Sequence, residues 1–517
     1  MQGKKLFLDK EVTRFRLSER VPPHNLYRRL AALVDWAFLY EETRALYSCT
    51  GQPSLDPVVF LKLVLVGRLE NLVSDRRLVE HCALRLDILF FLGYEVDEEL
   101  PWHSTISRTR QLFPAAVFER LFDHVFAQCV ARGLVAGERQ AVDSAPVKAN
   151  ASLDRLCEKQ PLEAFASLLR VAGQSPPTPV PPHPAAVLSA PAHQLRREAA
   201  RQAKSRRAPG PLGAQHAQAR LVSNKTHYSP TDPEARISVK PGKARALNYL
   251  CSLAVDAAQG VISHVQADLA DSRDSLHLPR LLAGLQQRLR KNELRLRDLL
   301  ADAGYANGSN YALLEKQHVT AWIPVFGQYK PEIDGFAYDL SADKYTCPAG
   351  KDLLFRKYDT TADGGWLKQY RATYRDCQQC HLKATCIPKA KCKQLTKTIY
   401  DAAYRRAWQR QQSRRGQRLR RVRQSTVEPV FGSLIHHYGL RRVNVRGHAG
   451  AHKTMLLTAV AYNLKKRLKH RPQRQASLAV TLPRPLLADT RRAWQRNRPP
   501  KAHTWALAKS LPKNGTA

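Results

Sequence analysis

The sequence predicts an α/β protein in which helices flank a mixed sheet, preceded by an all-helical region. Three observations favour this class. Long apolar runs with helix-capping residues fill residues 1–135. From residue 136, the order of segments is strand, hairpin, helix, strand, helix, strand. Strands alternating with helices are typical of an α/β fold, and the 44% hydrophobic content can supply a sizeable core.

The first two well-marked helices follow clear start signals. Asp56 and Pro57 are an N-cap and first-turn pair before the apolar run VVFLKLVLVGRLE. Ser74 opens a second expected helix, SDRRLVEHCALRLDILFFLG, which ends at Gly93.

Two further helices complete the region 1–135. A third begins near Ser104 and carries Arg108 and Arg110, and a fourth, PAAVFERLFDHVFAQCVARG, ends at Gly133. Short turns and an arginine-bearing first turn suit a helix-turn-helix-like DNA-binding domain, with Arg108 and Arg110 as candidate DNA contacts. A plain helical bundle that packs on the next domain has the same pattern, so both interpretations stay open.

Residues 136–470 form the expected second domain. RQAVDSA, around Asp143, predicts a strand, and YLCSLAVDAAQGVISHVQAD predicts a hairpin. SLHLPRLLAGLQQRLRK predicts an amphipathic helix, and LRDLLADAG a strand that ends at Asp302. NYALLEKQ then predicts a helix and HVTAWIPV a last strand.

Two segments interrupt this domain and a tail follows it. Residues 160–225 hold ten of the 32 prolines and are expected to be a disordered insertion. Residues 330–400 contain a cysteine-rich insertion. Residues 471–517, rich in proline and arginine, are expected to be a solvated basic tail.

The charge of the chain favours nucleic acid as its partner. The formal net charge is +39, and residues 401–517 carry 27 Lys and Arg against three acids. Such a surface attracts phosphate backbones. No stretch reaches the roughly 20 apolar residues of a membrane-spanning helix. The first residues, MQGKKLFLDKEV, lack an apolar signal core, so we expect a cytoplasmic protein with no membrane partner.

Three acids occupy positions suited to a metal site. Asp143 and Asp302 are each expected where an apolar strand ends, and strand ends of open α/β sheets converge on ligand sites. Two close carboxylates repel unless a cation lies between them, and Mg²⁺ prefers such hard oxygen ligands. Glu428 follows nine arginines and no acid in residues 405–423, so it is a candidate third ligand on a helix. The alternatives are a turn-forming or capping role for each aspartate and a surface ion pair for Glu428.

Other residues near these positions have simpler interpretations. Asp256, Asp268 and Asp271 are weaker candidates, because they lie at a hairpin turn or before a helix. Pro429 follows Glu428 directly, so either Ser425 or Thr426 caps a helix that restarts there, or the helix kinks.

Several motifs occur in a fixed order: AVDSAPVKANAS, LLADAGYANGSNY, STVEPVFGSL, GLRRVNVRGHAG and LLTAVAYNLKKRLK. Together they resemble bacterial insertion-sequence transposases of the DDE class, most like the IS-eleven-eighty-two group among IS-five- and IS-four-like elements, over residues 20–470. The resemblance implies an RNase H-like catalytic fold with Asp143 on the first strand, Asp302 on the fourth and Glu428 on a late helix. It also implies a helical N-terminal domain that binds the terminal inverted repeats of the element.

The same resemblance implies the chemistry. Asp143, Asp302 and Glu428 would hold two Mg²⁺ or Mn²⁺ ions, water would cut one strand at the element's end, and the freed 3′-hydroxyl would attack target DNA. The protein would act as a homodimer on DNA in the bacterial nucleoid. The implied DNA-end contacts are Lys148, Asn150, Tyr305 and Arg423. Relatives often carry a lysine about two turns after the glutamate, where this chain has Ile435, His436 and His437.

The cysteine-rich insertion predicts either a structural zinc site or reduced thiols that only pack. Cys377 and Cys380 form a C-x₂-C pair, and Cys347 and Cys386 supply two more thiols. Four thiolates are what a tetrahedral structural Zn²⁺ needs, and they leave no open position for catalysis.

The sequence therefore predicts a DDE transposase, an endonuclease and polynucleotidyl transferase with a two-metal mechanism. Two alternatives keep most of these features. One is a catalytically silent, transposase-derived regulator that binds the inverted repeats, and the other is an RNase H-like nuclease without strand transfer.

Overall fold

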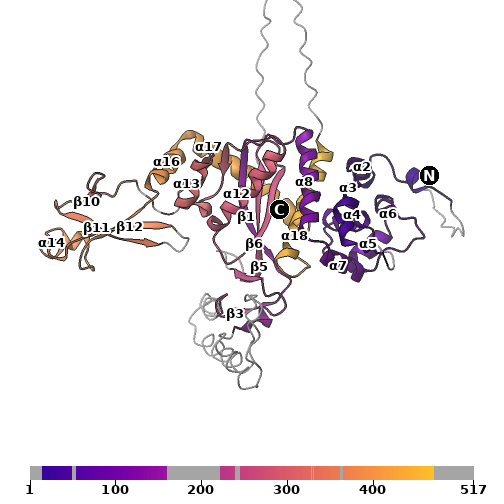
Figure 1. The fold of residues 1–517 in the computed structure, drawn as a ribbon, viewed down its shortest axis with the longest axis horizontal. Coiled ribbons are helices and arrows are strands. Elements are labelled where there is room, and N and C mark those ends of the chain that lie inside the picture. The colour runs from indigo at the N-terminus through magenta and orange to yellow at the C-terminus, as the bar shows by residue number, and fades with distance from the viewer. Residues whose placement is uncertain are drawn as a thin grey trace, which may run out of the picture. The chain divides into compact units, whose positions relative to one another are not determined.

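The computed structural model describes residues 14–48, 50, 54–159, 222–238, 245–325, 327, 329, 331–360 and 365–470 (Figure 1). The expected mixed α/β fold with a helical N-terminal region is confirmed. Most of the expected insertion at 160–225, and the whole tail at 471–517, lie outside the described residues. Within the described residues, no helix is long and apolar enough to cross a membrane.

The N-terminal region is helical, as predicted. Asp56 caps α4 as expected, because its Oδ1 accepts hydrogen bonds from the backbone amides of Val58 and Val59 at 2.7 and 3.0 Å. The elements are α1 (Leu17–Arg20), α2 (Leu26–Leu33), α3 (Phe38–Thr43), η1 (Arg44–Leu46), α4 (Pro57–Leu69), α5 (Asp75–Ala83), α6 (Leu86–Leu92), α7 (His103–Leu112) and α8 (Ala115–Ala131).

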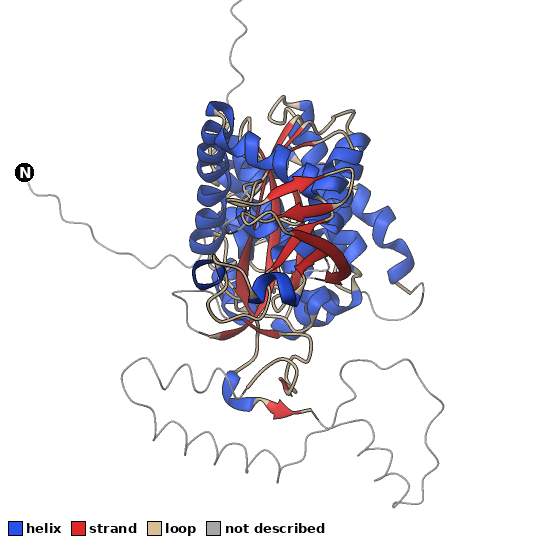
Figure 2. Cartoon of the chain, turned by 90° about the vertical axis from the view of Figure 1, so that its left-hand side faces the viewer, coloured by secondary structure: helices blue, strands red, loops and turns tan. Residues whose placement is uncertain are grey.

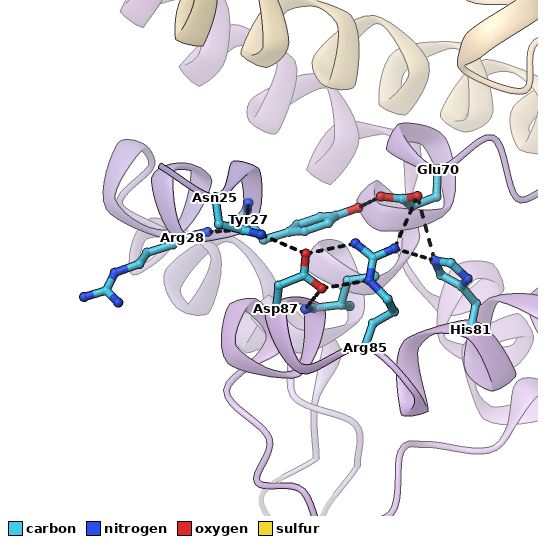
Figure 3. Close-up of polar contacts among 8 residues, drawn as sticks. Asn25, Tyr27, Arg28, Glu70, His81, Arg85 and Asp87 are labelled. Carbon is cyan, nitrogen blue, oxygen red and sulfur yellow. Dashed lines mark hydrogen bonds and ion pairs between the residues drawn. The ribbon is translucent and has the colours of Figure 1, made fainter. Parts of the chain in front are cut away.

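The single helix expected from Ser74 to Gly93 is wrong, because the chain breaks between α5 and α6. Arg85 is extended there, with φ −120° and ψ 101°, and its guanidinium forms two 2.9 Å hydrogen bonds with Asp87. Figure 3 shows this pair beside Glu70, whose Oε1 accepts from the hydroxyl of Tyr27 at 2.5 Å. Burial raises the pKa of that tyrosine well above its usual value. These contacts tie α2, α4 and α6 together at the break.

The central sheet has the strand order β4-β5-β1-β7-β8, and β6 pairs with residues 249–255 of β5, next to the part of β5 that pairs with β4. Strand β5 runs antiparallel to β1, β4 and β6, whereas β7 and β8 run parallel to β1. Figure 2 shows helices around these strands. The strands are β1 (Arg139–Lys148), β4 (Arg236–Ser238), β5 (Ala246–Asp256), β6 (Ile262–Leu269), β7 (Asp298–Leu300) and β8 (Thr320–Trp322), with the short pair β2 (Cys157–Glu158) and β3 (His227–Tyr228) and the turn η2 (Leu153–Arg155) apart from the sheet.

Helices cover the sheet and connect it to the N-terminal region. α12 and α18 pack against β6, and α17 lies along β1. α18 also packs against α2, α4 and α8, so the N-terminal helices and the sheet share one hydrophobic core. Residue 135 therefore marks a change of pattern in the sequence but no gap in the packing. These elements are α12 (Asp274–Lys291), η3 (Ala303–Tyr305), α13 (Gly308–Lys316), α16 (Asp401–Gln412), α17 (Arg414–His437) and α18 (His448–Lys469).

The cysteine-rich insertion forms a second antiparallel sheet of order β13-β12-β11-β10-β9. It has its own small core, made by Tyr345, Leu353, Tyr370, Ala372 and Leu395. Its elements are β9 (Ala337–Asp339), β10 (Lys344–Thr346), β11 (Asp352–Thr360), β12 (Trp366–Ala372), α14 (Tyr374–Gln378), α15 (Lys383–Cys386) and β13 (Gln394–Thr398).

Helix α17 passes through Pro429 without restarting. The hydroxyls of Ser425 and Thr426 do not cap a new helix. Instead they donate to the carbonyl oxygen of Val422, at 3.1 and 2.7 Å. Proline removes one backbone N–H from the helix, and the hydroxyl of Ser433 donates to the Pro429 carbonyl at 2.8 Å. Of the two geometries left open by the sequence, the restarted helix is wrong.

Candidate active site

The register of the central sheet brings Asp143 and Asp302 together. The parallel pairing of β1 with β7 ends at Ala141 opposite Leu300, so each aspartate lies two residues beyond the last pair. The sequence predicted that Asp143 lies at a strand end. This prediction is wrong, because β1 continues to Lys148 against β5. It lies where the neighbouring strand β7 has ended, which opens the sheet beside it.

The turn after β7 fixes the carboxylate of Asp302. This residue precedes η3, and its Oδ1 accepts a hydrogen bond from the Gly304 amide at 2.9 Å. A Cβ at Gly304 would lie 3.0 Å from that Oδ1 and 3.3 Å from Oδ2 of Asp274. Glycine therefore lets two carboxylates approach the same turn.

Asp274 is a fourth acid near the site that the sequence analysis did not identify. It is the first residue of α12, and its charge raises the pKa of Asp143. An acid in the first turn of a helix is common, since it favours the helix dipole. No signal in the sequence separated this residue from that ordinary role.

Glu428 comes from α17, the helix that lies along β1. Its side chain is 61% exposed, unlike the 19% of Asp143. Five residues earlier on the same helix, Arg423 is buried. The helix thus presents one arginine to the interior and one glutamate to solvent, on the side where the two aspartates lie.

All three predicted acids face the guanidinium of Arg423. Its Nη2 lies 3.5 Å from Oδ2 of Asp143 and 3.7 Å from Oδ2 of Asp302. Its Nη1 lies 3.9 Å from Oε1 of Glu428. Residues from a strand, a turn and a helix, separated by up to 285 positions between 143 and 428, therefore meet around one cation.

The electrostatics of Asp143 reflect this crowding. Burial raises the pKa of its carboxyl to about 6, with Arg423 opposing the shift and Asp302 adding to it. The Ser144 amide donates to its Oδ1 at 2.8 Å, which favours the ionised form.

Tyr305 does not lie on an open surface, which corrects its expected role as a DNA contact. It is fully buried, and its hydroxyl lies 2.5 Å from the Ser144 hydroxyl, which in turn lies 2.9 Å from that of Ser252. Tyr305 follows Asp302 by three residues and Ser144 follows Asp143 directly. The buried tyrosine therefore connects the turn after Asp302 with the part of β1 that carries Asp143.

The other expected DNA contacts differ in exposure and in their partners. Arg110 is 9% exposed and forms two 2.7 Å hydrogen bonds with Asp75, so its guanidinium is not available to DNA, which corrects that expectation. Arg108 and Lys148 are exposed. Asn150 accepts from Arg442 at 2.9 Å.

A polar cavity of about 870 Å³ adjoins the end of β1. Asn150, His436, Arg441 and Arg442 are among its lining residues. His436 stands in the short segment where relatives often carry a lysine. The histidine therefore lies beside two arginines, which supply the positive charge of this surface.

The weaker aspartate candidates have structural partners. Asp256 is buried and accepts from the Gly137 amide and the Gln140 side chain, both at 2.8 Å. Asp268 is buried and accepts from Ser252 at 2.7 Å. Asp271 forms an ion pair of 3.4 Å with Arg236.

Three carboxylates facing one cation position fit a hard divalent ion such as Mg²⁺ or Mn²⁺. In the arrangement seen, no group of three or more His, Cys, Asp or Glu among the described residues is close enough to hold a metal ion. Arg423, rather than a metal-sized gap, lies among the acids.

The four predicted zinc ligands, Cys347, Cys377, Cys380 and Cys386, line one cavity of about 300 Å³. The sulfur of Cys347 accepts from the Lys351 amide, and that of Cys377 from the Lys393 amide, both at 3.4 Å. The cysteines therefore share a cavity, and zinc remains a prediction.

Two segments of the chain match models of known families. Residues 15–112 match the Transposase domain (DUF772), and residues 346–468 match the Transposase DDE domain. The first covers α1 to α7. The second covers β11, β12 and β13 of the cysteine-rich sheet, Arg423 and Glu428, but not Asp143 or Asp302. No curated protein matches the chain. The two matches support an insertion-sequence DDE transposase, and neither bears on the IS-eleven-eighty-two group.

Proposed function

We propose that this insertion-sequence transposase binds the terminal inverted repeats of its element, cuts DNA there and joins the freed end to target DNA. The reaction would take place at a divalent metal site formed by Asp143, Asp302 and Glu428. The observation that carries the proposal is the convergence of these three carboxylates on Arg423 at 3.5, 3.7 and 3.9 Å.

The roles of the chain's own residues follow from their positions. When bound, two Mg²⁺ or Mn²⁺ ions would activate water or a 3′-hydroxyl and stabilise the leaving oxygen. Asp143 would be the fixed ligand, since β1 and the Ser144 amide hold it. Asp302 is held by its turn, and Glu428, the most exposed of the three, would adjust to the substrate.

The sheet topology supports an RNase H-like assignment as part of this proposal. Three antiparallel strands, β6, β5 and β1, are followed by two strands parallel to β1. That order places β1, which carries Asp143, beside β7, which leads to Asp302, so the two aspartates come from neighbouring strands. The proposal extends to a dimer on DNA, because the two ends of one element must be brought together. It also extends to a location at the bacterial nucleoid, where the DNA lies.

Positive side chains beside the acids support DNA as the substrate. On α17, Arg414, Arg418 and Arg421 are exposed at spacings of four and three residues, which place them on one helix face. Glu428 follows Arg421 by seven residues and shares that face. Arginines in a row would bind successive phosphates and position DNA over the acids.

The test uses the purified chain and a duplex that carries the inverted repeats flanking its gene. With Mg²⁺, the wild-type chain should cut the duplex at the repeat end. Asp143→Asn, Asp302→Asn and Glu428→Gln should each abolish cutting while retaining DNA binding. Asp271→Asn, which removes an acid paired with Arg236 outside the cluster, is the matched control and should cut normally.

The outcomes separate the competing functions. If the wild-type chain binds the duplex but never cuts it, the silent regulator is favoured. If it cuts but gives no joined product with a target plasmid, the nuclease is favoured. Normal cutting by all three triad variants would reject the proposed site.

A further inference from the structure

The guanidinium of Arg423 is buried among acids yet loosely bound. Its ion-pair distances to Asp143, Asp302 and Glu428 are 3.5, 3.7 and 3.9 Å. Charge-assisted hydrogen bonds are shorter, about 2.7–2.9 Å. Its Nη1 is buried and has no hydrogen-bond partner among the described residues. The side chain therefore offsets part of the negative charge of the three acids without being fixed to any one of them.

This arrangement has a cost and a use. An unpaired buried donor on a charged group is unfavourable, so the guanidinium gains if it can reach a better acceptor. The carboxylates, in turn, would repel each other without a cation between them. Arg423 thus keeps the acids together, but its own hydrogen bonds are left unmade.

A divalent ion and this guanidinium cannot both occupy the centre of the cluster favourably. Mg²⁺ binds oxygen at about 2.0–2.1 Å, which requires the carboxylates to turn toward the ion. A positive charge already within 4 Å of each carboxylate would oppose binding of the ion at the same place.

We propose that Arg423 is a resident cation that competes with the divalent metal for the three acids and moves to a DNA phosphate when the metal binds. This inference rests on the proposed metal site. A phosphate offers Arg423 the short, bidentate hydrogen bonds that it lacks among the acids. DNA would thereby raise the affinity for metal, and metal would raise the affinity for DNA by the same factor. The site would be fully loaded only when DNA is present.

The first experiment measures Mn²⁺ binding to the full chain without DNA, by electron paramagnetic resonance of the free ion. Arg423→Gln should bind Mn²⁺ at least about tenfold more tightly than wild type, because the competing charge is gone. Arg423→Lys, which keeps the charge, should remain close to wild type. Arg420→Gln removes an exposed arginine from the same helix and should leave Mn²⁺ affinity unchanged.

A thermal measurement provides a second readout. Without metal, Arg423→Gln should melt below wild type, because the acids repel each other. Saturating Mn²⁺ should raise its melting temperature by more than it raises that of wild type. An equal or smaller rise in the variant would overturn the proposal.

A third experiment needs no variant, so it stands even if Arg423→Gln does not fold. Mn²⁺ should bind the wild-type chain more tightly in the presence of a short DNA duplex, after subtraction of binding to the duplex alone. Equal affinity with and without DNA would contradict the exchange.

The two proposals fail differently. If Asp302→Asn binds Mn²⁺ as well as wild type, the proposed metal site itself is wrong. If Asp302→Asn weakens Mn²⁺ binding but Arg423→Gln does not strengthen it, the metal site stands and only the role of Arg423 is rejected.

Discussion

His264 on β6 is a buried imidazole among charged side chains. Its Nδ1 lies 2.5 Å from Nη1 of Arg288, a donor that is always charged, so this nitrogen accepts and the ring is neutral. Arg288 in turn pairs with Glu119 and Asp123 of α8. Burial, with Arg288 as the next cause, lowers the pKa of His264 well below 6.5, and the charges of His452 and Arg280 act in the same direction.

This histidine should make stability depend on pH. In the unfolded chain it takes up a proton below about pH 6.5, whereas the folded chain resists that proton. Stability is therefore complete above about pH 6.5 and falls by about 1.4 kcal/mol per pH unit below it. His264→Gln, which cannot titrate, should show a weaker loss in urea unfolding between about pH 7.5 and 5.5.

The control is His24→Gln, which removes an exposed histidine and should keep the wild-type dependence. A pH dependence of His264→Gln as steep as that of wild type would show that another group is responsible.

At the residue scale, motifs and the resemblance singled out three acids whose roles stay predictions, whereas contacts between distant side chains were not predicted. The meeting of Asp143, Asp302 and Glu428 around one point was anticipated from their settings and the resemblance. The burial of Tyr305 and the pairing of Arg110 with Asp75 were missed. Both depend on which partner a side chain meets across the fold, and no local pattern encodes that.

At the scale of elements, α17 has one face that packs on the sheet and another that exposes arginines. Its buried residues pack on β1, while Arg414, Arg418 and Arg421 are exposed. The sequence predicted an arginine-rich helix but left its course at Pro429 open. Hydrogen bonds from Ser425 and Thr426 to a carbonyl within the helix resolve that question.

We expect the exposed face of α17 to bind DNA phosphates. The triple change of Arg414, Arg418 and Arg421 to alanine should weaken DNA binding at every sequence. It should also reduce the slope of log K against log salt by roughly 2 to 3, since each lost phosphate contact contributes about 0.9. Fluorescence anisotropy with a labelled duplex at several salt concentrations measures both quantities.

The matched control replaces three exposed arginines elsewhere, Arg290, Arg356 and Arg375, and so changes net charge equally. An equal loss of slope in both triple variants would indicate that total charge, rather than this helix face, governs binding.

The cysteine-rich sheet yields a second prediction at this scale. If the cavity lined by Cys347, Cys377, Cys380 and Cys386 holds structural zinc, the purified chain should contain about one zinc ion. Chelation should then destabilise the sheet, because the binding free energy of a structural metal is folding free energy. Mass spectrometry of metals measures the zinc content.

Cys380→Ser should lose the zinc, whereas Cys157→Ser, outside the cavity, should keep it. A wild-type chain without zinc, purified in its presence, would favour reduced thiols that only pack.

At the scale of the whole molecule, α18 joins regions that the sequence separates. It packs against α2, α4 and α8 on one side and against β5 and β6 on the other. Its sequence is almost wholly apolar along LLTAVAYNL, which signals a buried helix but not its neighbours. Packing partners more than 300 residues away are set by the closed fold, so the shared core could not be predicted.

A substitution that creates a cavity beside α18 should therefore destabilise both the N-terminal helices and the central sheet. Leu456→Ala, at a fully buried position, should cost about 2–5 kcal/mol of unfolding free energy. Hydrogen exchange should increase together in peptides from α4 and β5, because they share one core. Leu340→Ala, at a position 82% exposed, is the control and should change neither. Faster exchange in only one of the two regions would show that they are stabilised separately.

The cysteine-rich sheet leaves and rejoins the rest of the chain at neighbouring points. The hydroxyl of Tyr329, before the sheet, lies 2.9 Å from Oδ1 of Asp401, after it, and the Val325 amide donates to Gln411 at 3.0 Å. Entry and exit this close mean that the segment can be shortened, exchanged or replaced by a brief linker without moving β8 or α16. Related transposases could thus gain or lose the whole sheet in one evolutionary step. A reporter protein could also be inserted at the same junction.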